Sequence, residues 1–306
     1  MNILGKRYYF FALSLLLIVS GLILLAITGL PLSIDFTGGS LLEIQFEKGK
    51  TPDSETILSI YEDAGIADAQ ATTTETGSLI IRSSFLTNEV RDAVLKALQE
   101  KSGSEASVVV IRFDSVGPSI GKQVTQRAAI AIAVASILVV LFIVWSFRNV
   151  ENAFRYGVCA ILAMLHDIAV IFSITGIGSY FFGWQIDSLF LTALLTVIGF
   201  SMQDTIVVFD RIRENSNLHR RLEYEKLVNH SIVQTLQRSI NTQLMTVEFL
   251  LLALALFGGV TLQEFAIVLL VGLLSGTYSS IFVAAPILVL WENREWQTWF
   301  GRKAEA

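Results

Sequence analysis

The chain has 306 residues, of which 53% are hydrophobic and only 16% are charged. Soluble domains contain about 25% charged residues, so this composition excludes an ordinary soluble domain and indicates a membrane protein. The net charge of −5 argues against a nucleic-acid partner, which requires a basic surface. The single cysteine, Cys159, excludes a disulfide framework and a thiolate metal site.

Six apolar runs are long enough to cross a lipid bilayer as helices, which takes about 20 residues each. The first run ends in Thr28-Gly29-Leu30-Pro31 without a small-x-small cleavage site, so we expect an uncleaved anchor. The expected fold is an α-helical membrane protein with six transmembrane helices. The runs cover about Tyr9–Leu30, Ala128–Phe147, Phe154–Ile174, Ser188–Phe209, Ile240–Gly258 and Phe265–Trp291.

Basic residues predict how these helices are oriented. Lys and Arg lie before the first run, between the second and third, between the fourth and fifth, and after the sixth, whereas the loops after the third and fifth runs contain none. Cytoplasmic loops carry the excess of Lys and Arg, so we expect both termini in the cytoplasm. The expected division is 1–30 for the amino terminus and first helix, 31–122 for an extracytoplasmic domain, 123–292 for five further helices and 293–306 for a cytoplasmic tail.

The segment 31–122 contains eight basic and fourteen acidic residues, a net charge of −6. Its hydrophobic patterning predicts strands and helices in the order β-α-β-β-α-β, which is the ferredoxin-like order of a small α+β domain. We find no catalytic arrangement of residues in it, which indicates a binding or lever domain. The expected elements are strand 41–46, helix 52–64, strands 66–73 and 78–83, a helix that begins at Thr87, and strand 108–113.

The fourth run contains one carboxylate, Asp204, in the sequence Ile198 to Asn215. Charged side chains within membrane spans are rare and usually functional, although Asp204 could also lie at the lipid headgroups. Arg238 opens the fifth run and shares a helix face with Glu248 at 100° per residue. Arg238 and Asp204 are expected at similar depth, where an ion pair would open when Asp204 takes a proton. Alternatively, Arg238 extends to the headgroups.

Other polar groups in the runs have two interpretations each. His166 and Asp167 in the third run could relay protons or form hydrogen bonds that pack helices. Asp210 and Arg213 are three residues apart, which favours a local ion pair at a helix end over direct chemistry. In the sixth run, Gly272, Gly276 and Ser280 are spaced four apart, and Ser275 and Ser279 lie beside them. We attribute this pattern to close helix packing.

Two segments outside the runs are also notable. The sequence from Val116 to Gln123 contains two glycines and a proline, which indicates a hinge or a plain loop before the second helix. From Ser216 to Gln237 the chain is amphipathic, which favours a connecting helix that lies in the membrane interface.

Three motifs together resemble the SecF family of bacterial protein-export subunits, over essentially the whole chain. They are Asp35-Phe36-Thr37-Gly38-Gly39-Ser40, Val116-Gly117-Pro118 and the sequence from Asp204 to Asn215, with support from Arg238 to Thr242, Phe257-Gly258-Gly259 and Ser275 to Ser280. Two residues depart from the family pattern. Gln203 stands where asparagine is common, and Glu248 stands where the family usually has a small hydroxyl or apolar residue.

The resemblance implies a six-span module of the resistance-nodulation-division superfamily in the bacterial cytoplasmic membrane. Such a module pairs with SecD and uses the proton-motive force to help draw exported, unfolded polypeptides through the SecYEG channel, alongside YajC- and YidC-type proteins. It implies a transport role without an enzymatic reaction, a cofactor or a metal, and with protons as the coupling ion. In that family the fourth-span aspartate and fifth-span arginine, which correspond to Asp204 and Arg238, are tied to proton movement. SecD supplies the other essential carboxylate.

Two alternatives belong to different classes. A related proton-driven exporter of lipids or small hydrophobic molecules would share the fold, but such exporters carry two six-span halves and two large outer domains in one chain. A membrane assembly factor would explain the helices and the small-residue packing, but it would not explain Asp204 opposite Arg238.

Overall fold

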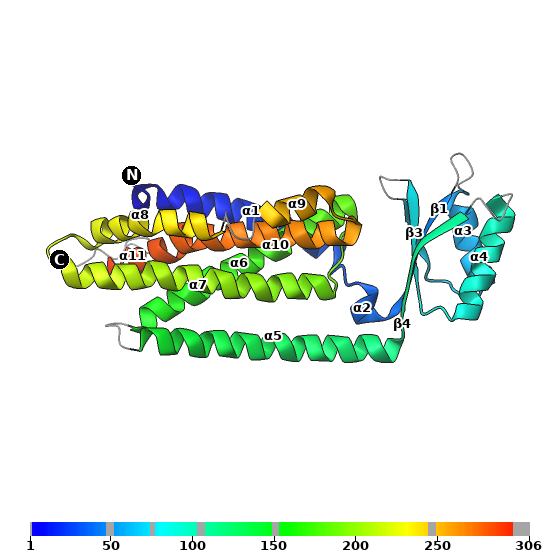
Figure 1. Cartoon of the computed structure of the whole chain (residues 1–306), viewed down its shortest axis with the longest axis horizontal. Coiled ribbons are helices and arrows are strands. Elements are labelled where there is room, and N and C mark those ends of the chain that lie inside the picture. The colour runs from blue at the N-terminus through cyan, green and yellow to red at the C-terminus, as the bar shows by residue number, and fades with distance from the viewer. Residues whose placement is uncertain are drawn as a thin grey trace. The chain divides into compact units, whose positions relative to one another are not determined.

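The computed structural model describes residues 2–46, 52–73, 77–102, 108–148, 153–243 and 249–295. The chain divides into two compact units. A helical unit contains Met1–Pro31 and Ala131–Ala306, and a smaller unit, Leu32–Ile130, contains a sheet (Figure 1). A long helix, α5 (Pro118–Phe147), passes from the second unit into the first.

The smaller unit is built on a four-stranded antiparallel sheet with the order β2-β3-β1-β4. Two helices cover one face of this sheet (Figure 1). The succession of strands and helices confirms the β-α-β-β-α-β order that the sequence predicts. The elements are β1 (Gly39–Phe46), α3 (Ser54–Asp63), β2 (Gln70–Thr73), β3 (Ser78–Ser83), α4 (Asn88–Ser102) and β4 (Val108–Val116).

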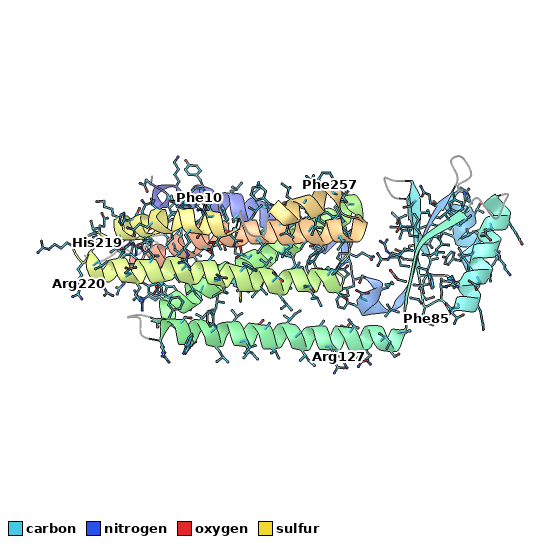
Figure 2. The ribbon with its side chains drawn as sticks, viewed as in Figure 1. Phe10, Phe85, Arg127, His219, Arg220 and Phe257 are labelled. Carbon is cyan, nitrogen blue, oxygen red and sulfur yellow. The ribbon has the colours of Figure 1, made fainter. Side chains whose placement is uncertain are left out.

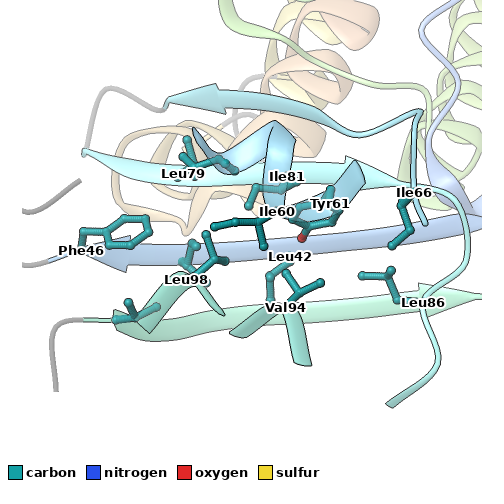
Figure 3. Packing of buried hydrophobic residues seen from close by; sticks show 13 residues of the cluster. Leu42, Phe46, Ile60, Tyr61, Ile66, Leu79, Ile81, Leu86, Val94 and Leu98 are labelled. Atoms are coloured by element: carbon teal, nitrogen blue, oxygen red, sulfur yellow. The ribbon is translucent and has the colours of Figure 1, made fainter. Parts of the chain in front are cut away.

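The core of this unit follows from alternation in the strands and helical spacing in the helices (Figure 3). In β1, Leu42, Ile44 and Phe46 are buried, because alternate side chains of a strand point to the same face. They pack beneath α3 and α4, whose buried side chains include Ile57, Ile60, Tyr61, Val94 and Leu98. Burial raises the pKa of the Tyr61 hydroxyl.

The paired glycines between α2 (Ile34–Thr37) and β1 pack against the start of α5. Gly38 has a φ of +73° and Gly39 a φ of +128°, backbone conformations that favour glycine. A Cβ atom at Gly121 would lie 2.6 Å from the Gly38 nitrogen, and Thr125 Oγ1 donates a hydrogen bond to the Phe36 carbonyl at 2.9 Å. The segment from Val116 to Gln123 is a short junction between β4 and α5, as the plain-loop alternative predicts, and a hinge at this junction stays a prediction. Its residues from Pro118 onward form the first turns of α5, because proline is well suited to the first position of a helix.

The helical unit contains α1 and α6 to α11, together with the carboxyl-terminal part of α5. Within the described residues, five helical segments are long and apolar enough to cross a membrane: Leu4–Thr28, Pro118–Phe147, Ala153–Phe182, Ser188–Leu218 and Leu262–Glu292. The remaining expected run, Ile240–Gly258, includes residues 244–248, which lie outside the described part of the chain. The helices are α1 (Arg7–Thr28), α6 (Ala153–Phe182), α7 (Ser188–Leu218), α8 (Tyr224–Gln243), α9 (Phe249–Phe257), α10 (Val260–Ser279) and α11 (Ala285–Glu292).

The connecting segment differs from the expected interfacial helix over 216–237. α7 continues through Leu218, and α8 runs without a break past Arg238 to Gln243. The reason is burial, because Leu227, Val228 and Ile232 of α8 lie inside the bundle at 3% exposure or less. Figure 2 shows His219 and Arg220 in the α7–α8 turn at one end of the helical unit and Phe257 towards the other end.

Small residues allow α1 and α6 to approach closely. A Cβ atom at Gly21 would lie 2.0 Å from Ser173 Oγ, and one at Gly176 would lie 2.6 Å from the Gly21 carbonyl oxygen. Ser173 Oγ donates a hydrogen bond to the Leu17 carbonyl at 2.7 Å. These contacts place the middle of α6 directly against α1.

Three segments that are distant in sequence meet near the start of α1. The Arg7 guanidinium pairs with Glu295 at 2.7 Å and with Glu225 at 3.3 Å. The Asn229 side chain accepts a hydrogen bond from the Ile3 backbone at 2.8 Å. We refer to this group of Ile3, Arg7, Glu225, Asn229 and Glu295 as the terminal clamp.

The last span is not a uniform α-helix. Between α10 and α11 lies one π-helical segment, η4 (Ser280–Ala284). Such segments are rare and are often found at functional sites. This one lies beside the polar residues described next.

Candidate functional site

Asp204 lies in the second half of α7 and is 8% exposed. Ser239 Oγ, on α8, donates a hydrogen bond to its Oδ1 atom at 3.0 Å. The other oxygen, Oδ2, and the Thr277 hydroxyl on α10 are both buried and neither makes a well-aligned hydrogen bond in the described part of the chain, although the Thr277 side chain is close enough to interact with the Asp204 carboxyl. A buried carboxylate with one unpaired oxygen is uncommon, because burying a charge is costly unless it is paired.

Arg238 immediately precedes Ser239 on α8 and is exposed. Its charge acts on the Asp204 carboxyl, but no salt bridge joins the two side chains among the described residues. Arg238 instead lines a cavity of about 380 Å³ between α5, α7 and α8, together with Asp210, Arg211 and Glu214. The structure thus brings Asp204 and Arg238 into one region, with Ser239 as the group in direct contact.

Asp167, on α6, is 1% exposed and has a full set of hydrogen-bond donors. Ser275 Oγ donates to its Oδ1 atom at 2.7 Å. Ser201 Oγ and Ser279 Oγ donate to its Oδ2 atom at 2.5 and 2.6 Å. The three serines come from α7 and α10, so one carboxylate joins three helices. We refer to Asp167, Ser201, Ser275 and Ser279 as the Asp167 cluster.

His166 extends this polar group towards α1. Its Nδ1 atom lies 3.1 Å from Asp167 Oδ1, and its Nε2 atom contacts Ser14 Oγ. The Tyr278 ring stacks on the imidazole, with centroids 6.1 Å apart. The hydrogen bonds predicted as the packing alternative for His166 and Asp167 are therefore present. They also include Ser275 and Ser279, which we had attributed to packing alone.

The other candidate residues lie elsewhere. Asp210 pairs with Arg213 at 2.6 Å on the exposed side of α7, which confirms the expected local ion pair. Glu248 lies outside the described residues. No group of three His, Cys, Asp or Glu side chains in the described part of the chain could hold a metal ion.

The sequence did not indicate which serines donate hydrogen bonds to Asp167 and which to Asp204. Ser275 and Ser279 are four residues apart and so lie on one helix face, a signal that could have suggested a shared partner. Ser201 and Ser239 carried no such signal, because a single serine in an apolar helix is as often a packing residue as a ligand.

Comparison with known proteins identifies the family. Residues 94–294 match the family described as "Protein export membrane protein SecD/SecF, C-terminal", and residues 23–50 match the "SecD/SecF GG Motif". The chain is 61% identical to the protein translocase subunit SecF of Anaerolinea thermophila, over 100% of this chain and 98% of that protein. The chain belongs to the SecF family. The SecF of Thermobaculum terrenum is 45% identical over 98% of this chain and 97% of its own length.

A solved structure shows how a SecF chain relates to longer proteins. The crystal structure of SecDF from Thermus thermophilus superposes with a TM-score of 0.80 at 33% identity, and the match covers 96% of this chain but 39% of that one. SecF therefore corresponds to one part of a longer SecDF chain. The glycine motif of the family includes Gly38 and Gly39, which pack against α5 in this structure.

Proposed function

We propose that this SecF chain is a proton-coupled accessory subunit of the Sec protein translocase, and that Asp204 is its proton-binding group. The observation that carries the proposal is the half-paired carboxylate. Oδ1 has Ser239 as its donor, whereas Oδ2 is buried without one in the described part of the chain. An unpaired buried oxygen offers a position where a proton can bind.

The surroundings can accommodate both states of Asp204. In the ionised state, Ser239 donates to the carboxylate and the positive charge of Arg238 acts on it. In the protonated state, the carboxyl group gains an O–H donor. The Thr277 hydroxyl, which is buried and interacts with the Asp204 carboxyl, can accept that hydrogen bond. Protonation would therefore shift the strongest hydrogen bond of Asp204 from Ser239 on α8 to Thr277 on α10.

The partner of this subunit in the proposal is SecD. In the relatives named SecDF from Thermus thermophilus and Bacillus subtilis, a segment similar to this chain makes up 39% and 38% of the protein. In addition, only 6% of the most apolar window of α1 and of α5 is buried, compared with 50% for α7. Helices with such uncovered apolar surfaces face lipid or a second membrane subunit. By family resemblance we extend the proposal to SecYEG, YajC- or YidC-type proteins and the exported polypeptide.

We also propose that the smaller unit lies outside the cytoplasm and that both termini lie inside, as the positions of Lys and Arg suggest. In intact spheroplasts, a cysteine introduced at Ser54 should react with an impermeant reagent, and one at Asn217 should not. Both positions are exposed, and the background variant Cys159→Ser removes the native thiol. The reverse labelling pattern would overturn this orientation.

The variant Asp204→Asn tests the proton-binding role. Asparagine is nearly isosteric and cannot ionise, so the complex with SecD should assemble normally while proton uptake and proton-driven export in proteoliposomes are lost. The matched control is Asp210→Asn, an exposed carboxylate on the same helix, which should retain both activities. An assembled Asp204→Asn complex with wild-type proton uptake and export would contradict the proposal.

A further inference from the structure

Hydroxyl groups at the end of α10 and the start of η4 lie on opposite sides of the helix, one side binding Asp167 and the other lying beside Asp204. Ser275 and Ser279 are about 40° apart around the helix and bind Asp167. Thr277 and Ser280 lie about 60° apart on the other side. The Ser280 hydroxyl lies 3.1 Å from that of Thr205, the residue next to Asp204. α6, α7 and α10 run together in the helical unit (Figure 1), so α10 contacts both carboxylate-bearing helices.

α7 connects the same two carboxylates by a second route. Ser201, which donates to Asp167, lies one helical turn before Asp204. At this position α10 and α7 are in tight contact, because a Cβ atom at Gly276 would lie 3.1 Å from Ser201 Cβ. Packed interiors do not absorb such shifts locally. A movement of α7 around Asp204 must therefore move Ser201 relative to Asp167 or carry α10 with it.

The polar residues lie directly before a change in helix type. α10 ends at Ser279 and the π-helical segment begins at Ser280. In a π-turn the backbone hydrogen bonds run from residue i to i+5. Returning this turn to the α-helical pattern would rotate the residues before it relative to those after it. The sixth span thus contains a discrete point at which both hydroxyl-bearing faces can turn together relative to α11.

From these contacts we propose that Asp167 is a positioning residue for the proton-coupled step at Asp204, and that α10 transmits the state of Asp204 to the Asp167 cluster. This inference rests on the proposed function. In this inference, Asp167 does not carry the transported proton. Its carboxylate holds α6, α7 and α10 in one arrangement, and a proton on Asp204 shifts α7 and α10 against that arrangement. Weakening the cluster should therefore separate proton uptake from export while leaving proton binding in place.

The experiment uses the full chain in complex with SecD and the SecYEG channel in proteoliposomes, and it measures proton uptake and precursor export together. The test variant is Ser275→Ala/Ser279→Ala, which removes two donors to Asp167. We expect export per proton to fall about tenfold, within the range of coupling found between linked sites, while proton uptake continues. The variant Ser275→Thr/Ser279→Thr keeps both hydroxyls and should restore the ratio.

The matched control is Ser173→Ala. Ser173 is a fully buried serine of α6 that bonds to Leu17 and does not touch either carboxylate, so its ratio should stay at the wild-type value. If the double alanine variant does not assemble, the single variant Ser201→Ala removes a donor from α7 and should lower the ratio in the same way.

The outcomes separate this inference from the proposed function. A wild-type export-to-proton ratio in the assembled Asp167-cluster variants would overturn the inference, and so would an equal loss in Ser173→Ala. In either case, loss of proton uptake in Asp204→Asn would leave the proposed function intact. Wild-type proton uptake in Asp204→Asn would overturn the proposed function, and the inference with it.

Discussion

Asp204 and Asp167 are two carboxylates in the same helical unit, on adjacent helices and similarly withdrawn from solvent, but their surroundings differ. Asp167 receives three serine hydroxyls and contacts His166, so both of its oxygens are occupied. Asp204 receives one serine hydroxyl, and its second oxygen has no partner among the described residues. The difference indicates a fixed anchor in one case and an exchangeable site in the other.

The comparison predicts different costs of removing each carboxylate. Asp167→Ala leaves the buried Ser201 and Ser275 hydroxyls without an acceptor, and each such group costs about 1–3 kcal/mol. We expect Asp167→Ala to lower the unfolding free energy by about 3 kcal/mol or more. For Asp204→Ala we expect a decrease of about 1 kcal/mol, because only the Ser239 hydroxyl loses its acceptor. The measurement is the apparent melting temperature of each variant in complex with SecD. Equal destabilisation by the two variants would break the distinction between anchor and exchangeable site.

The single donor to Asp204 gives the next largest expected effect. Ser239→Ala should reduce proton-driven export about tenfold, because one hydrogen bond to a charged group contributes about 1.5 kcal/mol or more. Ser239→Thr, which keeps a hydroxyl, should retain most activity. A suitable control is Ser231→Ala, a buried serine earlier on α8 that bonds to Leu227 and Asn215. If Ser239→Ala exports at the wild-type rate, the hydrogen bond from Ser239 to Asp204 does not contribute to export.

A smaller effect is expected at the contact between α10 and α7. Gly276→Ala would place its Cβ atom 3.1 Å from Ser201 Cβ, so Ser201 must shift by a few tenths of an ångström within its bond to Asp167. Overpacking of this kind costs about 1 kcal/mol or more. Gly199→Ala on α7 is the control, since its Cβ atom would meet nothing within 4 Å. The melting temperature of Gly199→Ala should be higher than that of Gly276→Ala. Equal melting temperatures would show that the contact between Gly276 and Ser201 can adjust to an added methyl group.

The smallest effect concerns an exposed carboxylate, which serves as a reference for the two buried ones. Asp53 begins α3 and accepts a hydrogen bond from the Thr56 backbone at 3.0 Å. Hydrogen bonds from Thr56 lower the pKa of Asp53 below its usual 3.8. Its stabilisation is therefore complete above the pKa of the unfolded chain and is lost as the pH falls through the lower folded value. Hydrogen exchange of the first turn of α3, corrected for intrinsic rates, should show this loss in the wild type but not in Asp53→Asn.

The features that the sequence predicts are those that depend on local pattern. Hydropathy identifies the apolar helices because length and composition suffice for that inference. Alternation identifies the strands of the smaller unit because one face of the sheet is buried. Asp204 stands out because a carboxylate in an apolar helix is unusual whatever surrounds it.

The features that the sequence does not predict depend on contacts between distant segments. Asp167 depends on Ser201, Ser275 and Ser279, up to 112 positions away along the chain, and no local pattern connects them to it. The expected boundary at Gln237 is wrong because one face of α8 packs against the bundle along the whole helix, from Leu227 to Gln243, and this packing continues past Arg238. The direct contact to Asp204 falls on Ser239, one residue after the arginine that the pattern highlights.

The terminal clamp has a consequence for synthesis in the cell. Arg7 and Glu295 are 288 positions apart in the chain, and bacterial and other ribosomes add about 5–20 residues per second. Arg7 therefore waits about 15–60 s for this ion-pair partner after it has been made. During that interval Arg7 can pair with Glu225 only after α8 has been synthesised. A chain released from the ribosome before Glu295 would lack this ion pair to the first helix.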